Sequence, residues 1–323
     1  MKRTLIAACT LMLFSSSALA SDFPSKAVHM IVPYAAGGST DGLARVMAEA
    51  MSKSLGQPIV VENVGGGGGM IGLRRLMQSE PDGYTISLGN MGNFAIAGTL
   101  YPSANYDPRR DVAPVGLVAK VPMVLSVSQK SGIKSMDELL GKLRVPNSPI
   151  NIGHSGPGST GHIASIYFGM VTDTKGQQIS YRGAGPAIAD LMGGVVDVVI
   201  DQTVTMIPAS KGGRVIPLAV SGEKRVAELP DTPTFAEAGV PKFDLHVWNA
   251  VVAPVGTPPD RIEVLAKAIS EAFNDPKVKA QMETFAAPIP PAEEQGPDYL
   301  KSLIDSEVPR FEEIIKEAKL QVE

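Results

Sequence analysis

Short apolar runs alternate with longer amphipathic segments along most of this chain. The apolar runs are rich in valine and isoleucine and end at glycine, proline, asparagine or aspartate, which predicts strands. We expect strands at 28–33, 58–63, 84–89, 123–128, 150–153, 179–181, 195–201, 216–221 and 249–253. Alternation of strand and helix patterns predicts an α/β fold, with mixed, mostly parallel sheets flanked by helices.

The segments between these strands carry the three- and four-residue spacing of amphipathic helices. One pattern begins near Leu43 and ends at Gly56, and another surrounds Ile163 and Met170. Two further helices, at 259–273 and 297–319, close the chain, with Pro309 expected to kink the last. Such an ending suggests that the chain returns to its first part.

We therefore expect two lobes with a ligand cleft between them. The first lobe would comprise 21–120 plus 246–323, and the second 121–245. The chain would cross between lobes near 118–121 and 244–246, where strand-like segments would act as hinges.

The first twenty residues are typical of an export signal rather than of the fold. Lys2 and Arg3 precede an apolar stretch, and the small residues at 18–20 predict cleavage after Ala20. Cys9, the only cysteine, lies in this segment. A mature chain without cysteine excludes disulfides and cysteine catalysis, and the signal predicts a periplasmic location.

The charge balance is mildly acidic, with 29 basic and 33 acidic residues. Without Lys2 and Arg3 the basic count is 27, so the mature net charge is about −6. No basic cluster interrupts this balance, and we expect no nucleic-acid partner. No convergent metal-ligand set stands out, and we expect neither metal nor cofactor.

A strand–loop–helix element with the same chemistry occurs twice. Its loops place glycines and hydroxyls where a helix begins, and backbone N–H groups there bind anions. We predict that a small carboxylate is held between them. The candidate residues are Tyr34, Ala36, Gly37, Gly38, Ser39 and Thr40 in the first loop, and Ser155, Gly156, Gly158, Ser159 and Thr160 in the second.

Other polar residues follow predicted strands, where ligands of open α/β sheets collect. Asn90, Asn93 and Asp201 are candidates for ligand contact on this ground. Arg182 could pair with a carboxylate through two hydrogen bonds or lie exposed at the rim. His162 is either a neutral donor near the cleft or a packing residue.

Other residues in and near the two loops are expected to have structural roles. Ser39, Thr40 or Asp41 should cap the first helix, with Asp41 a partner of the helix dipole and of Arg45. Ser159 or Thr160 should cap the second. The glycines at 65–69 lack the ending of a phosphate-binding loop, and we expect a flexible surface turn there.

An enzymatic alternative rests on Ser155, in the stretch GHSGP at 153–157. It resembles the nucleophile elbow of serine hydrolases, but Pro157 stands where that turn needs a small residue. We favour a protein without catalytic activity. A sensor subunit that presents its ligand to a membrane kinase is a further alternative, because it would use the same closed shape.

Several motifs, in order from about residue 22 to 320, resemble the periplasmic solute receptors of tripartite tricarboxylate transporters (TTT), also called Bug receptors. They are IVPYAAGGSTD at 31–41, VVEN at 60–63, PDGYT at 81–85, YDP at 106–108, GPGS at 156–159, YRG at 181–183, GGVVD at 193–197, LPDTPT at 229–234 and AP at 253–254. Departures are the glycine run at 65–69, which usually includes Pro and Ala, and Arg182, where lysine is common.

The resemblance implies a two-lobed periplasmic-binding-protein fold, type II-like, and no catalysis. It also implies delivery of a mono-, di- or tricarboxylate to the permease subunits of a membrane transporter. We expect a monomer with an organic acid as its ligand.

Overall fold

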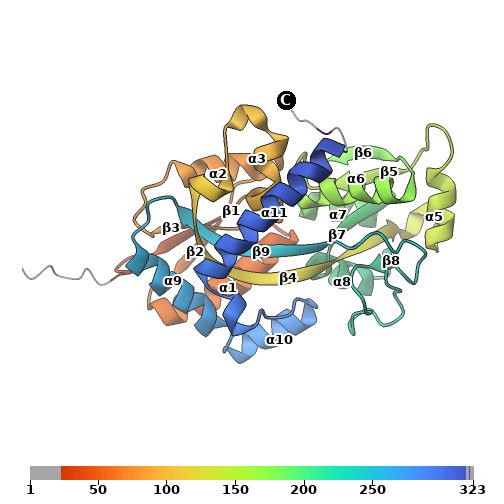
Figure 1. The fold of residues 1–323 in the computed structure, drawn as a ribbon. Coiled ribbons are helices and arrows are strands. Elements are labelled where there is room, and N and C mark those ends of the chain that lie inside the picture. The colour runs from red at the N-terminus through yellow and green to blue at the C-terminus, as the bar shows by residue number, and fades with distance from the viewer. Residues whose placement is uncertain (1–22, 318–319, 321–323) are drawn as a thin grey trace, which may run out of the picture.

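The computed structural model describes residues 23–317 and 320 of this 323-residue chain. The predicted signal peptide lies outside the described residues. Strands and helices alternate as the sequence patterns predict, and helices flank a curled sheet (Figure 1). Within the described part, no helix is both long enough and apolar enough to cross a bilayer.

The strands are β1 Val28–Val32, β2 Ile59–Asn63, β3 Thr85–Asn90, β4 Val112–Ser128, β5 Asn151–His154, β6 Gln177–Ser180, β7 Val198–Gln202, β8 Val215–Val220 and β9 His246–Pro254. The α-helices are α1 Ser39–Leu55, α2 Met70–Met77, α3 Ala97–Leu100, α4 Pro108–Asp111, α5 Met136–Leu143, α6 Thr160–Thr172, α7 Ala184–Gly193, α8 Thr203–Lys211, α9 Pro259–Ala272, α10 Pro276–Thr284 and α11 Pro297–Glu317. A π-helix at Gly92–Ile96 and short 3-10 turns, among them Gly67–Gly69, complete the order.

The strands follow the order β2-β1-β3-β9-β4-β7-β5-β6, and β8 pairs with β4. Residues 112–122 of β4 pair with β9, whereas residues 123–128 pair with β7 and β8. We call the elements around β1, β2, β3 and β9 the first half, and those around β5 to β8 the second half. Neighbours β1–β2, β1–β3, β5–β6 and β5–β7 are parallel, and the antiparallel pairings all involve β4 or β9.

Strands β4 and β9 join the halves, and both are longer than the sequence patterns predict (Figure 1). The expected strands covered only 123–128 and 249–253. Pro114 and Pro122 concealed the first part of β4, since proline argues against a strand interior. Its pairing with β9 shifts register between Pro114 and Gly116, and such a bulge accommodates a residue that cannot donate a ladder hydrogen bond.

Helix boundaries follow local signals at most places. Gly56 ends α1 in the left-handed conformation, φ 65°, and Pro259 occupies the first turn of α9. Helix α10 was missed because Asn274-Asp275-Pro276 resembles a stop. Asp275 instead caps a new helix, with its carboxylate accepting from the Lys277 amide at 2.8 Å.

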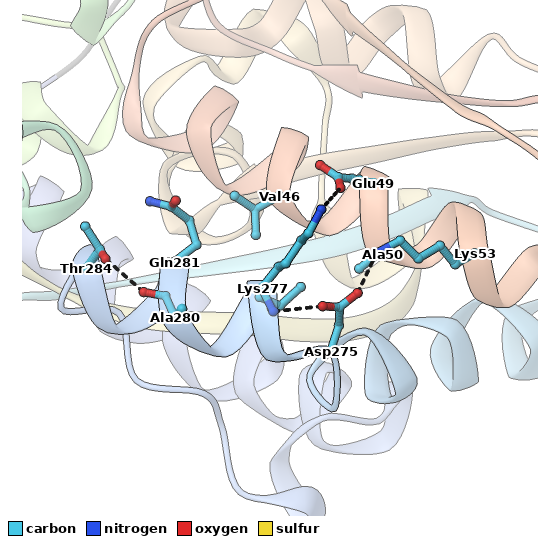
Figure 2. A pocket seen from close by; sticks show the side chains of 10 residues that line it. Val46, Glu49, Ala50, Lys53, Asp275, Lys277, Ala280, Gln281 and Thr284 are labelled. Atoms are coloured by element: carbon cyan, nitrogen blue, oxygen red, sulfur yellow. Dashed lines mark hydrogen bonds and ion pairs between the residues drawn. The ribbon is translucent and has the colours of Figure 1, made fainter.

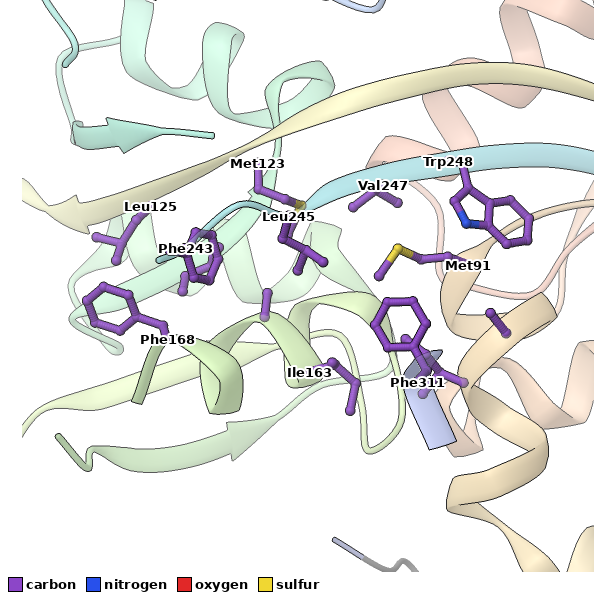
Figure 3. Close-up of a cluster of buried hydrophobic side chains, with 14 of the residues drawn as sticks. Met91, Met123, Leu125, Ile163, Phe168, Phe243, Leu245, Val247, Trp248 and Phe311 are labelled. Carbon is purple, nitrogen blue, oxygen red and sulfur yellow. The ribbon is translucent and has the colours of Figure 1, made fainter. Parts of the chain in front are cut away.

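The largest hydrophobic cluster extends through both halves on one side of the connecting strands. Figure 3 shows it running from Trp248 and Phe311 past Val247 and Met123 to Phe168. Trp248 is buried and stacks on Phe94 of the π-helix, with ring centroids 6.2 Å apart. The only tryptophan is therefore a core residue whose ring contacts the segment that follows Asn90.

Candidate functional site

A small polar cavity lies between the two halves, where the carboxyl ends of β3, β5 and β7 face the loop after β1. It contains about 290 Å³ of space not filled by atoms. The first half contributes Tyr34, Gly38, Ser39, Thr40 and Asn90. The second half contributes Ser155, Thr160, Gly161, Ala184, Asp201 and Gln202. Both loops that were expected to form a site from their glycines and hydroxyls contribute to this cavity.

Four helices begin at this cavity. Gly38, Ser159, Gly183 and Gln202 are the N-cap residues of α1, α6, α7 and α8. The amides of Ser39, Thr40 and Thr160 have no hydrogen-bond acceptor among the described residues. Free amides and the positive ends of helix dipoles favour negative charge, so the cavity is chemically suited to a carboxylate without a lysine or arginine in its lining.

The start of α1 differs from the expected capping. Gly38 is the N-cap and supplies no side chain, while Ser39 is already the first helical residue. Asp41 accepts hydrogen bonds from the Gly37 amide at 2.9 Å and from Arg45, which hold its pKa below the ordinary value despite burial. Asp41 therefore holds the loop before α1 through the Gly37 amide. It does not cap the first amides of α1, which stay free at the cavity. The predicted pairing of Asp41 with Arg45 is confirmed.

At the start of α6, Ser159 is the cap, as predicted. Its hydroxyl accepts from the His162 amide at 3.3 Å and donates to the Gly156 carbonyl at 2.6 Å. His162 is a packing residue and an acceptor: its Nδ1 accepts from the Gly158 amide at 3.1 Å, and its ring lies 4.5 Å from that of His154. Burial lowers the pKa of both rings to about 4.

Asn90 connects the halves through its side-chain amide. Its Oδ1 accepts from the Thr160 hydroxyl at 3.0 Å, across the cavity, and from the Tyr34 hydroxyl at 3.2 Å. Its Nδ2 donates to the Thr40 hydroxyl at 3.2 Å. Because its hydrogen bonds are made within the protein, Asn90 orients the groups on both sides of the cavity.

Part of the predicted set lies outside the cavity lining. Arg182 is exposed, and its contribution is its backbone carbonyl, which accepts from the Ala35 amide at 3.3 Å across the halves. Asn93 is buried, and its Oδ1 accepts a hydrogen bond from the backbone amide of Asn90 at 3.1 Å. The other predicted residues outside the lining are Ala36, Gly37, Gly156, Gly158, Ser159 and His162.

The prediction of a flexible surface turn at 65–69 is wrong. Gly68 and Gly69 are buried in a 3-10 turn, and Gly66 to Gly69 all have positive φ. A Cβ on Gly68 would overlap the carbonyl oxygen of Pro157, in the second half. Glycine is needed at this position because the backbones of the two halves approach too closely for any side chain.

Several residues that line the cavity, or that contact its lining, were not among the predicted site residues. Asn249 of β9 donates its Nδ2 to Gln202 Oε1 at 2.7 Å, and both side chains are buried. An asparagine inside the apolar run of β9 was a signal that could have found it. Gly161 and Ala184 had no such signal, since helix starts at glycine or alanine carry no side-chain marker.

The geometry does not favour a serine hydrolase at Ser155. Within the described residues, no hydrogen bond joins its hydroxyl to a histidine, and the Nδ1 atoms of His154 and His162 accept backbone amides. Nor do three or more metal-ligating side chains of histidine, cysteine, aspartate or glutamate converge anywhere in the described part of the chain.

A larger hollow, with about 780 Å³ of unfilled space, lies on the outer face of the first half between α1 and α10 (Figure 2). Its charged side chains neutralise one another: Lys53 pairs with Asp275 at 2.7 Å, and Lys277 lies 3.7 Å from Glu49. Exposed pairs of this kind hold helices together weakly and leave no unbalanced charge for a ligand.

Comparison with known proteins agrees with this geometry. Residues 43–320 match the model of the tripartite tricarboxylate transporter family receptor. BugT of Bordetella pertussis is 36% identical over 305 residues, covering 94% of this chain and 93% of that protein. The periplasmic binding protein BugD superimposes with a TM-score of 0.89 at 34% identity, covering 93% of this chain and 99% of BugD.

MatC from Rhodopseudomonas palustris, solved with bound malate, has a TM-score of 0.87 at 32% identity, with 91% of this chain and all of MatC covered (100%). The described fold is thus the two-lobed fold of periplasmic binding proteins. With its family match over most of its length, this chain belongs to the receptors of the tripartite tricarboxylate transporter family.

Proposed function

We propose that this protein captures a small organic carboxylate in the periplasm, between two lobes, and delivers it to the membrane subunits of a tripartite transporter. The main support is that α1, α6, α7 and α8, from both halves, begin at one cavity between them. Its lining provides hydroxyls and free amides but no cationic side chain. Such a site recognises the negative charge of an acid through backbone dipoles.

The proposed lobes are residues 21–120 plus 246–323, and residues 121–245. The change of partner of β4 between Pro122 and Met123 supports the first boundary. The start of β9 at His246 supports the second. A ligand that contacts both lobes would stabilise the closed form over the open form, and the transporter would bind the closed form.

Several observations support this assignment over the alternatives. The malate bound by MatC is a small dicarboxylate, and receptors of this family bind solutes rather than transform them. We propose that the protein acts as a monomer, without catalysis or cofactor.

The test is a titration of the purified mature protein with mono-, di- and tricarboxylates, followed by calorimetry and by Trp248 fluorescence. An acid present at about 100 times its Kd should stabilise the fold by about 2.7 kcal/mol. The methyl esters of the same acid should not bind, because they lack the charge that the amides contact. Tight binding of a neutral solute with no response to any acid would overturn the proposal. Loss of acid uptake by a strain lacking the gene would support delivery.

A further inference from the structure

Asp201 is the charged residue among those that line the cavity, all of which lie in the described part of the chain. It stands at the carboxyl end of β7 and is 7% exposed. No ion pair reaches it from any described residue. Burial raises the pKa of Asp201. In its ionised form this carboxyl opposes the binding of an anion unless a donor on the ligand compensates for the charge.

The hydrogen bonds of Asp201 leave room for such compensation. Ser39 Oγ donates to Asp201 Oδ2 at 3.1 Å from the first half, and Thr205 Oγ1 donates to the same oxygen at 2.8 Å. The other oxygen, Oδ1, has no side-chain donor among the described residues. A backbone hydrogen bond from Gln202 also reaches the carboxyl group. These neutral donors are weaker partners for a buried carboxylate than a charged donor would be.

The position of Asp201 limits where a ligand donor would lie. Ser39 is the first residue of α1, and its amide is one of the free groups proposed to hold the carboxylate. Its hydroxyl is one hydrogen bond from Asp201. A group that reaches Asp201 while the carboxylate stays at the start of α1 must therefore be attached close to that carboxylate.

We infer that Asp201 selects acids that carry a hydrogen-bond donor, hydroxyl or ammonium, on the carbon next to the carboxylate. This inference rests on the proposed carboxylate-binding function and names the substrate class of the same cavity. Asp201 accepts the donor, and the amides of the helix starts hold the carboxylate. Acids without the donor leave the Asp201 carboxyl facing an anion with no compensating contact.

The experiment compares matched acids by calorimetry: propionate, lactate and alanine; succinate, malate and aspartate; glutarate, 2-hydroxyglutarate and glutamate. In the set of the preferred chain length, the hydroxy or amino acid should bind at least ~10-fold more tightly than its parent, as a hydrogen bond to a charged group implies. In the Asp201→Asn variant, the affinities of the substituted acid and its parent should differ by no more than ~3-fold. The fall in affinity for the substituted acid should be larger if its donor is ammonium than if it is hydroxyl.

Asp41→Asn is the matched control, because Asp41 is also a buried acid but bonds to the loop behind the cavity. It should weaken all acids alike and leave the ratio unchanged. Equal binding of parent and substituted acids by the unaltered protein would overturn the inference while leaving the receptor function intact. So would a ratio that persists in Asp201→Asn or, if that variant does not fold, in Asp201→Ala. Failure of every acid to bind would overturn both proposals.

Discussion

Single residues at the cavity are held by hydrogen bonds that cross from one half to the other. Asn90 accepts from Thr160, and Ser39 donates to Asp201. Within the second half, the Nδ1 atoms of His154 and His162 accept the backbone amides of the loop that precedes α6. Neutral histidine is required for this role, because a protonated ring has no acceptor atom.

This requirement makes stability depend on pH. Burial lowers the pKa of His154 and His162 to about 4 from 6.5, so the unfolded chain binds more protons between these values. The contribution of the two rings to the free energy of unfolding should therefore be complete above pH 6.5 and decline as the pH falls towards 4, by at most about 3 kcal/mol per ring. The lowered pKa of Asp41 acts only below its ordinary 3.8, outside this window. The raised pKa of Asp201 acts above 3.8 and with the opposite sign, so the histidine contribution is read from the difference between the histidine variants and the unaltered protein.

Urea unfolding at several pH values between about 7 and 4.5 measures the effect. His154→Asn and His162→Asn together should flatten the profile, because asparagine can accept the same amides without titrating. The exposed His246, replaced in the same way, serves as the control. An unaltered profile in the double variant would contradict this account.

At the scale of elements, the turn Gly67–Gly69 is the part of the first half that meets the loop before α6. Tyr101 donates its hydroxyl to the Pro157 carbonyl at the same place, so the approach is fixed by a side chain as well as by backbone. Glycine serves two needs here: it adopts the left-handed conformation, and it leaves no Cβ between the two backbones.

Substitutions at two adjacent glycines separate these needs. Gly67 and Gly68 have similar φ values, 54° and 60°, so alanine should cost each a similar ~1 kcal/mol or more of stability. A Cβ at Gly67 meets nothing closer than 3.8 Å, whereas one at Gly68 overlaps Pro157. Gly68→Ala should lower ligand affinity by ~10-fold or more, because the halves cannot close fully. Gly67→Ala should change affinity little. Calorimetry decides, and equal effects on affinity would refute this function of the turn.

At the scale of the whole molecule, the cavity lies between halves that β4 and β9 connect. In the proposed function a solute enters while the lobes are apart, and closure of the lobes then controls access. The mature chain is expected to lack cysteine, which allows a crosslink to test this directly.

Gly38 and Ala184 lie on opposite sides of the cavity, and a Cβ on Gly38 would be 3.4 Å from the Ala184 Cβ. This is close to the ~3.8 Å typical of disulfides. The oxidised Gly38→Cys/Ala184→Cys protein should not bind ligand added after oxidation, and a reductant should restore binding. The two single variants control for the new side chains. Rapid binding by the oxidised protein would show that access does not require opening.

Much of this architecture is readable from local patterns. The periodicity of α1, its stop at Gly56 and the proline at the start of α9 are short-range signals, and they placed those elements correctly. The two polar loops were identified as one site because glycine and hydroxyl residues precede both helices. The first part of β4, α10 and the π-helix were not identified, because prolines and long-range packing overrode the local pattern.

The sequence by itself determined the alternation of strands and helices and the family resemblance, and it predicted two helix starts as an anion site. These depend on residue types within a few positions of one another. Only the tertiary structure decided which groups face the cavity: it placed the Arg182 side chain outside, brought the starts of α7 and α8 in, and set Asp201 against Ser39. The physical reason is that these groups are far apart in the chain, and their distances are set by how two halves pack across β4 and β9.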